Sequence, residues 1–289
     1  MEIESLDIDD GLDIVDDSNG TALIDADTLA YTTCLYLEVK EELLPKEFYT
    51  EEEWASIIDD PDYDEESHAI YRIDLDELLK EAKSKVEELR YKTRSKNVEL
   101  YFSSGKTFRN KLCDTYKGQR VRMRYPEGLE WLKRELVKNY DGMVCEGFEA
   151  DDIVVYKKRR EPKKYKLVAV DKDVLKSVPG KHFDYYHKRM HWVETRIQEA
   201  TKWPYIQALV GDTADNIAGV KGIGPKKAEK LLAEAVLPCD CWKVVVQAYE
   251  DNGLTIKHAI ETMRLVYMHS LYEENGQYKI KLWEPPCEI

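Results

Sequence analysis

Short apolar runs that alternate with helical segments are the feature of this sequence that most constrains its fold. The runs are strand-sized and rich in β-branched and aromatic residues, and they span 21–25, 98–102, 143–145 and 165–170. Apolar residues at helical spacing fill the intervals, at about 28–40, 74–96, 126–140, 149–160 and 171–178. Strands that alternate with helices form parallel sheets covered by helices. The sequence therefore predicts an α/β fold with a parallel sheet.

Polar side chains follow each predicted strand. The ligand crevice of a parallel α/β sheet lies at the carboxyl ends of its strands, so these side chains are expected to face one cleft. They are Asp25, Ser103, Glu149 and Asp171. The other acidic residues expected near this cleft are Asp27, Asp151, Asp152, Asp173, Asp212 and Asp215. Carboxylates this close together need cations in order to stay ionised.

Hard divalent cations are the usual partners of such a cluster, and Mg²⁺ prefers a few carboxylates plus water. Two such ions about 4 Å apart can activate water and stabilise the leaving oxygen in phosphodiester cleavage. One aspartate after a strand is weak support, because it is more often a helix N-cap than a ligand. Asp27, just before the helix predicted at 28–40, fits that N-cap role. Four acidic clusters that end successive elements favour a two-metal centre.

A glycine-rich turn follows the last acidic pair and leads into a helix that begins with lysines. The residues concerned are Gly219, Gly222, Gly224, Lys226 and Lys227. Backbone N–H groups at such a turn bind phosphate, and the lysines add sequence-independent affinity for a DNA backbone. The alternative is an ordinary turn between two helices with solvated lysines.

A basic segment precedes the helix predicted at 126–140. Residues 105–124 carry seven Lys or Arg and one acid. Interleaved aromatic residues suit base stacking beside phosphate contacts. The alternative is a solvated basic loop. The residues that could contact nucleic acid here are Arg109, Tyr116, Lys117 and Arg120.

The net charge of −14 is distributed very unevenly along the chain. Residues 1–66 hold 23 Asp or Glu against two lysines, a balance of −21, whereas the remainder has 34 acids and 41 Lys or Arg, a balance of +7. Residues 1–20 are expected to be a disordered acidic tail. Residues 41–70 form an acidic, aromatic-containing insertion, with a turn at Asp60-Pro61-Asp62. Most of the chain is therefore basic enough to bind nucleic acid.

Several protein classes are excluded by the sequence. The longest apolar stretches are strand-sized, so no segment is expected to span a membrane. The N-terminus is acidic where a secretory signal would be basic and then apolar. The six cysteines have neither disulfide-framework nor zinc spacing, which suits a reducing cytoplasm. We therefore expect a soluble cytoplasmic protein without disulfides.

Taken in order, five motifs resemble those of the 5′-nuclease family of flap endonucleases and 5′→3′ exonucleases. Phage members and the 5′-nuclease domains of bacterial DNA polymerases are the nearest relatives in this respect. The motifs are Leu23-Ile-Asp25, Tyr116-Lys117-Gly-x-Arg120, Glu149-Ala-Asp151-Asp152, Val170-Asp171-Lys-Asp173, and Gly211-Asp212-x-x-Asp215 running on to Gly224. The resemblance covers roughly 21–40 and 96–283.

The resemblance implies a PIN-like α/β nuclease core over 21–193 and a helical region over 194–289. The latter would contain a helix-three-turn-helix duplex-binding element and a C-terminal strand. The first metal ion would be held by Asp25, Glu149, Asp151 and Asp171, with Asp152 close by. The second would be held by Asp173, Asp212 and Asp215 together with Asp171. We expect Mg²⁺, which Mn²⁺ can replace, and the family often has K⁺ at the glycine turn.

The resemblance also implies roles for the basic segment. Lys117 and Arg120 would stabilise the scissile phosphate, and Tyr116 would stack on the terminal base. The expected substrates are duplex DNA with 5′ ends, 5′ flaps and RNA–DNA hybrids. Only residues 121–125 separate the Lys117/Arg120 pair from the next helix, whereas members that thread a free strand often have a longer helical arch. This favours exonuclease action on duplex ends, with RNA-primer removal, in the manner of phage enzymes that act in the host cytoplasm.

One departure from the family leaves other functions open. The family usually places a metal-site aspartate where this chain has Ser103, so the first site is one carboxylate short. Asp27 or a water molecule on Ser103 could compensate. A non-catalytic duplex-binding protein of the same fold is therefore an alternative. A haloacid-dehalogenase-type phosphatase with Asp25 as nucleophile is a more distant one. The insertion 41–70 could be a surface excursion, a docking arm for a protein partner or an acidic mimic of DNA.

Overall fold

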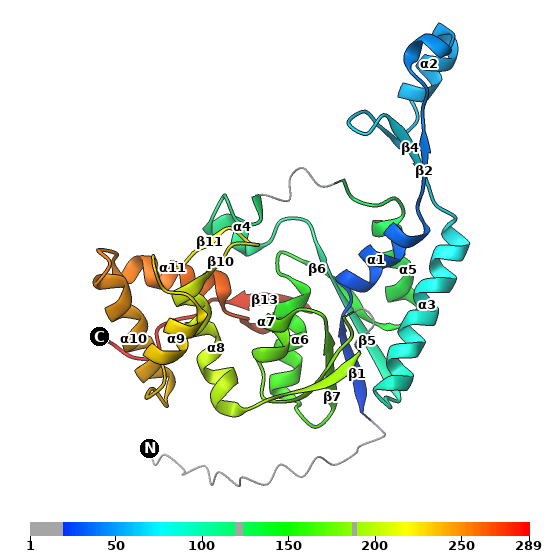
Figure 1. Cartoon of the computed structure of the whole chain (residues 1–289). Helices are drawn as coiled ribbons and strands as arrows, with labels where there is room; N and C mark the ends of the chain where they lie inside the picture. Colours follow the sequence, from blue (N-terminus) through cyan, green and yellow to red (C-terminus); the bar gives the residue numbers. More distant parts are fainter. Residues whose placement is uncertain (1–19, 119–123, 187–189) are drawn as a thin grey trace.

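The computed structural model describes residues 20–118, 124–186 and 190–289, and Figure 1 shows their arrangement. The predicted acidic tail, 1–20, and Arg120 fall outside the described residues, apart from residue 20 itself. The predictions made for them are therefore not tested by the structure.

A six-stranded sheet forms the centre of the molecule, in the order β6-β5-β1-β7-β8-β9. The first five of these are parallel to one another and only β9 is antiparallel to its neighbour. The strands are β1 (Thr21–Asp25), β5 (Asn97–Ser104), β6 (Asp141–Glu146), β7 (Tyr165–Ala169), β8 (Gly180–Asp184) and β9 (His191–Thr195). The predicted α/β fold and its four strands are confirmed, whereas the sequence did not predict β8 and β9.

Helices cover both faces of this sheet because alternate residues of β1 point to opposite sides. Ala22 and Ile24 pack in one apolar cluster and Leu23 packs in another. The first cluster is completed by α1 (Asp27–Leu37), α3 (Leu75–Lys92) and α5 (Leu129–Asn139). The second is completed by α6 (Ala150–Arg160) and α7 (Lys172–Lys176). A short helix, α4 (Phe108–Leu112), begins the basic segment.

The C-terminal part is mainly helical and has a core of its own around Trp242 and Tyr249. Its helices are α8 (Ile197–Val210), α9 (Pro225–Leu231), α10 (Pro238–Glu250) and α11 (Ile256–Val266). A two-residue-stranded hairpin, β10 (Gly211–Asp212) with β11 (Ile217–Ala218), joins α8 to the glycine turn. A second hairpin, β12 (Ser270–Glu274) with β13 (Gln277–Lys281), returns to the six-stranded sheet and packs beside α6.

The acidic insertion is an ordered arm rather than a loop. It consists of β2 (Val39–Glu42), the 3₁₀ helix η1 (Lys46–Phe48), α2 (Glu51–Ile58), β3 (Tyr63–Asp64) and β4 (Ala69–Arg72). The strands form an antiparallel sheet in the order β2-β4-β3, and α2 has no buried residue. The predicted turn at 60–62 is confirmed, and Arg72 pairs with both of its aspartates. In Figure 1 the arm stands away from the rest of the chain.

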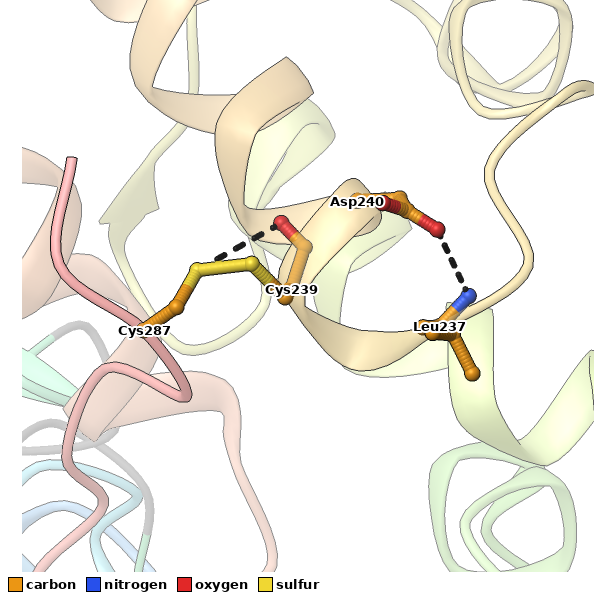
Figure 2. Close-up of a disulfide and its surroundings, with 4 residues drawn as sticks. All are labelled: Leu237, Cys239, Asp240 and Cys287. Atoms are coloured by element: carbon orange, nitrogen blue, oxygen red, sulfur yellow. Dashed lines mark hydrogen bonds between the residues drawn. A yellow bond between two sulfur atoms is a disulfide. The ribbon is translucent and has the colours of Figure 1, made fainter.

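The structure contradicts the expectation that the cysteines are unpaired. Cys239 at the start of α10 and Cys287 in the C-terminal segment form a disulfide, with an S–S distance of 2.09 Å and a Cα–Cα distance of 5.7 Å (Figure 2). The two residues are 48 positions apart, so only the tertiary fold brings them together. Within the described ranges, no helix is long and apolar enough to cross a membrane.

Candidate metal centre and nucleic-acid interface

The predicted acidic residues converge at the carboxyl ends of the strands. One cavity is lined by the carboxylates of Glu149, Asp151, Asp171, Asp173, Asp212 and Asp215. Asp25, at the end of β1, is buried beside them and contacts Asp151 and Asp171 electrostatically. These residues come from four different elements, so the α/β topology creates the cluster.

Local helix geometry fixes several of these side chains. Glu149 is the N-cap residue of α6 and Asp171 is the N-cap residue of α7. The Asp171 carboxylate accepts a hydrogen bond of 2.7 Å from the backbone N–H of Asp173. The β10–β11 hairpin carries Asp212 and delivers Asp215 to the opposite side of the cavity. Asp171 therefore caps a helix and lines the cavity at the same time, so an N-cap role does not exclude a role in the site.

Burial and mutual repulsion disfavour the ionised form of several of these carboxyls. Burial, and then the charges of Asp27 and Asp171, raise the pKa of Asp25 to about 8. Burial, followed by the charge of Asp171, raises the pKa of Asp173 to about 7. Burial, then Asp25, raises the pKa of Asp151 well above its usual range. The cluster therefore holds more negative charge than the protein alone can balance.

Two buried carboxylate oxygens support a divalent cation as the positive charge that this cluster lacks. Oδ1 of Asp25 and Oδ1 of Asp173 have no hydrogen-bond partner. Carboxylate oxygens without partners are the donors that Mg²⁺ and Mn²⁺ prefer. Over the described ranges, no three His, Cys, Asp or Glu side chains are arranged to hold an ion as they stand. The donor set fits hard divalent ions.

Lys117 contacts two of the carboxylates that line the acidic cavity. Its Nζ donates to Glu149 Oε1 at 2.6 Å and lies 3.8 Å from Asp215 Oδ2. Its backbone N–H donates to the Asp215 carbonyl, and its φ of 53° is in the left-handed region. Burial opposes its charge, but Glu149 and then Asp151 raise the pKa of Lys117 overall. A permanent ammonium group is therefore positioned at the carboxylates.

Tyr116 does not lie where a base-stacking residue is expected. Its side chain is 4% exposed and packs in the core of the helical region. Its hydroxyl donates to Glu149 Oε2 at 3.0 Å and to Asp215 Oδ2 at 3.2 Å. Tyr116 therefore links the start of α6 to the β10–β11 hairpin. A side chain this deeply buried is not available to stack on a DNA base.

Arg109 likewise differs from the DNA-contacting residue that was expected. It is 2% exposed, and its guanidinium forms two hydrogen bonds to Asp152, of 2.7 and 2.9 Å, and one of 3.1 Å to Glu149. It also donates to the carbonyls of Leu265 and Tyr267. All of the guanidinium donors are bonded to protein acceptors, so Arg109 stabilises the protein interior and does not contact DNA.

Asp152 is accordingly a partner of Arg109 more than a metal donor. Both of its oxygens accept from Arg109, and Oδ1 also accepts from the His269 N–H at 3.0 Å. Burial alone would raise its pKa, but Arg109 and His269 lower the pKa of Asp152 overall. Motif spacing predicted its proximity to the metal site and missed this pairing.

The glycine turn is exposed in the way that phosphate binding requires. Gly222 has a φ of 76°, and space around Gly222 and Gly224 is open. Lys226 and Lys227 are exposed at the start of α9. Gly219 is required for close packing, since a Cβ there would lie 2.2 Å from the backbone of Val210.

Sequence reasoning missed a buried cation beside this site. Lys133, on α5, lies 3.7 Å from Asp27 and donates to the Ser103 carbonyl at 3.0 Å. Its only sequence signal is a lysine within the apolar spacing of the helix predicted at 126–140. Burial at that position depends on α5 packing against β5, which no local pattern reveals.

Comparisons with known proteins find similar nucleases and polymerases. No family model matches the sequence. A 5′-3′ exonuclease of Buchnera aphidicola is 34% identical over 157 residues, which is 48% of this chain and 53% of that protein. DNA polymerase I of Rhizobium leguminosarum is 37% identical over 149 residues, which is 47% of this chain and 14% of the polymerase. The chain thus spans about half the length of the exonucleases it matches and less of the polymerases.

Solved structures show the same fold. The flap endonuclease of bacteriophage T5, in a complex with DNA and metal ions, aligns with a TM-score of 0.53 at 20% identity. The alignment covers 66% of this chain and 80% of that one. The mixed, mostly parallel sheet is therefore the 5′-nuclease sheet. This chain therefore has the fold of the T5 enzyme and is similar in sequence, over about half of its length, to 5′-3′ exonucleases and to bacterial DNA polymerase I.

Proposed function

We propose that this protein is a metal-dependent nuclease that hydrolyses phosphodiester bonds of DNA from 5′ ends. The observation that carries the proposal is the cavity in which at least six carboxylates and one ammonium group meet. Such a cavity has no use in duplex binding, because its negative charge repels DNA unless cations are present. The Buchnera relative bears the same activity in its name.

Two divalent ions, Mg²⁺ or Mn²⁺, would be held by two groups of carboxylates. The first group is Asp25, Glu149, Asp151 and Asp171, and the second is Asp173, Asp212 and Asp215, again with Asp171. When bound, such ions lower the pKa of water and stabilise charge on phosphoryl oxygens. Lys117 would add its ammonium charge beside the scissile phosphate, with Arg120 as its expected partner.

Duplex DNA would be held by the exposed glycine turn. Gly222 and Gly224 leave backbone N–H groups accessible, and Lys226 and Lys227 add counter-charge to phosphates. A K⁺ ion at this turn would complete the phosphate site. The T5 enzyme was solved with DNA and metal ions, and this chain shares its fold.

The substrate preference is a finer proposal. The short connection after Lys117 favours duplex 5′ ends over threaded flaps, with removal of RNA primers from RNA–DNA hybrids. The experiment compares Mg²⁺-dependent digestion of a 5′-labelled duplex, a 5′ flap and an RNA–DNA hybrid. Asp171→Ala should abolish all three activities, and Glu250→Gln, on an exposed end of α10, is the matched control.

Two results would contradict the proposal. If the wild type binds duplex tightly but cuts none of the three substrates, the protein is a duplex-binding member of the family. If Asp171→Ala retains activity, the carboxylate cavity is not the catalytic centre. A flap-to-duplex-end rate ratio well above one would overturn only the preference for duplex ends.

A further inference from the structure

Beside the acidic cavity, a buried lysine of α5 contacts the end of β5. The Lys133 side chain is 9% exposed, and its Nζ donates to the Ser103 carbonyl and to Glu130 Oε1, each at 3.0 Å. The same Nζ lies 3.7 Å from Asp27 Oδ1. An ammonium group buried to this degree needs a carboxylate partner close by, because its desolvation is otherwise uncompensated.

Asp27 is committed to the same corner of the site. Both of its carboxylate oxygens accept from the Ser103 backbone N–H, at 3.0 Å each. The Ser103 hydroxyl accepts from the Ala150 N–H at the start of α6, at 2.9 Å. Ser103 thus links β5 to α1 and α6, and it orients the Asp27 carboxylate toward β5 and Lys133.

We propose that Lys133 is a positioning residue that holds Asp27 as its counter-ion and keeps it out of the metal-ligand set. A metal ion on Asp27 would stand next to the Lys133 ammonium and would be repelled by it. The opposite charges of Lys133 and Asp27 therefore cancel at the edge of the first metal site. The affinity of that site for a metal ion is then set by the remaining carboxylates. This inference rests on the proposed metal-dependent function.

The charges of Lys133 and Asp27 should affect how tightly divalent cations bind in the cavity. Removing Lys133 alone takes one positive charge away and leaves Asp27 without its counter-ion, so divalent cations should bind more tightly. Removing Asp27 alone leaves the Lys133 ammonium without this counter-ion, so divalent cations should bind more weakly even though Asp27 donates no oxygen to the ion. Removing both charges together should return the affinity close to that of the wild type.

Direct metal binding tests these expectations without DNA cleavage. Ca²⁺ or Mn²⁺ is titrated calorimetrically into the DNA-free full chain and into Asp27→Asn, Lys133→Met, Lys133→Arg and the Asp27→Asn/Lys133→Met double variant. Asp25→Asn is the reference for loss of a ligand. The Lys133→Met variant should bind about tenfold more tightly and Asp27→Asn about tenfold more weakly. Lys133→Arg and the double variant should stay within about threefold of the wild type. Asp25→Asn should lose at least about tenfold.

Each other outcome overturns a specific part of the inference. An affinity loss in the double variant as large as that in Asp25→Asn would make Asp27 a metal ligand. Unchanged affinity in Lys133→Met would leave Lys133 with a purely structural role. If Lys133→Met does not fold, the double variant and Lys133→Arg decide, because the proposal requires both to bind like the wild type. If the wild type binds no divalent ion, the proposed metal-dependent function is refuted. That outcome can be told apart from the variant effects above.

Discussion

Replacing Arg109 with methionine removes the cation from a fully enclosed cluster of charges. Arg109 is 2% exposed and Asp152 is 0% exposed, and two hydrogen bonds join them. Breaking a buried pair by deleting one partner costs about 3–5 kcal/mol, because the remaining charge has no compensation. Three further acceptors, in Glu149, Leu265 and Tyr267, lose their donor at the same time. We expect Arg109→Met to lower the free energy of unfolding by about that amount at pH 7.

The loss should depend on pH in a defined direction. In the wild type the pKa of Asp152 is lowered, so its stabilising contribution is present above the unfolded value and is lost as pH falls through the folded value. In Arg109→Met, Asp152 is buried without its cation and its pKa should rise. Protonation then relieves the defect, so the difference between variant and wild type should shrink as pH approaches about 4.

Urea unfolding at several pH values measures both effects. Arg134→Met is the matched control, because Arg134 is exposed on α5, and its effect should stay within about 0.5 kcal/mol. Duplex binding supplies a second readout. If Arg109 contacted phosphate, its loss would reduce the salt dependence of binding by about one unit. A destabilisation no larger than that of Arg134→Met, together with a reduced salt slope, would refute the internal role and restore the DNA contact.

Three other predictions concern the site. Lys117→Met should slow single-turnover DNA cleavage about 10²- to 10³-fold, with partial rescue in Lys117→Arg, and an equal loss in both variants would contradict a charge role. Gly219→Ala should lower stability to urea by about 1–3 kcal/mol, because a Cβ there meets backbone at 2.2 Å, whereas Gly224→Ala should be tolerated. Without metal, the raised pKa values of Asp25 and Asp173, about 8 and about 7, mean that the folded state holds protons that the unfolded state has lost. Thermal stability of the metal-free chain should therefore fall as pH rises from about 4 to 8, and Mg²⁺ should remove that trend, so the same slope with and without Mg²⁺ would contradict a metal site at these carboxyls.

Local patterns predicted the central strands and the side chains at their ends well, because strand periodicity and strand-end position are properties of short segments. Strands β8 and β9 escaped detection since both alternate only weakly and have exposed polar residues such as His191. The arm over 39–72 has so few buried residues that its sheet leaves little apolar signal.

The roles of individual cations depended on tertiary contacts that the sequence does not encode locally. Arg109 has the sequence context of a DNA-binding residue, but α4 lies against α6 and α11, which place acceptors on every side of it. Lys133 is one lysine among many until α5 packs on β5. The Cys239–Cys287 disulfide likewise joins segments that only the fold makes neighbours.

The β12–β13 hairpin ties the order of synthesis to the completion of the core. Met268 and Leu271 are buried in the same apolar cluster as Leu23 and Ile153, although about 250 residues separate the ends of that cluster in sequence. The Arg159 guanidinium donates to the Met268 carbonyl across this contact. On a ribosome that adds about 5–20 residues per second, the face of α6 would remain uncovered for at least several seconds after α6 is made. The β12–β13 hairpin, which is made after α6, thus closes a core that also contains Leu23 of β1, and nascent chains without it would expose apolar surface to chaperones.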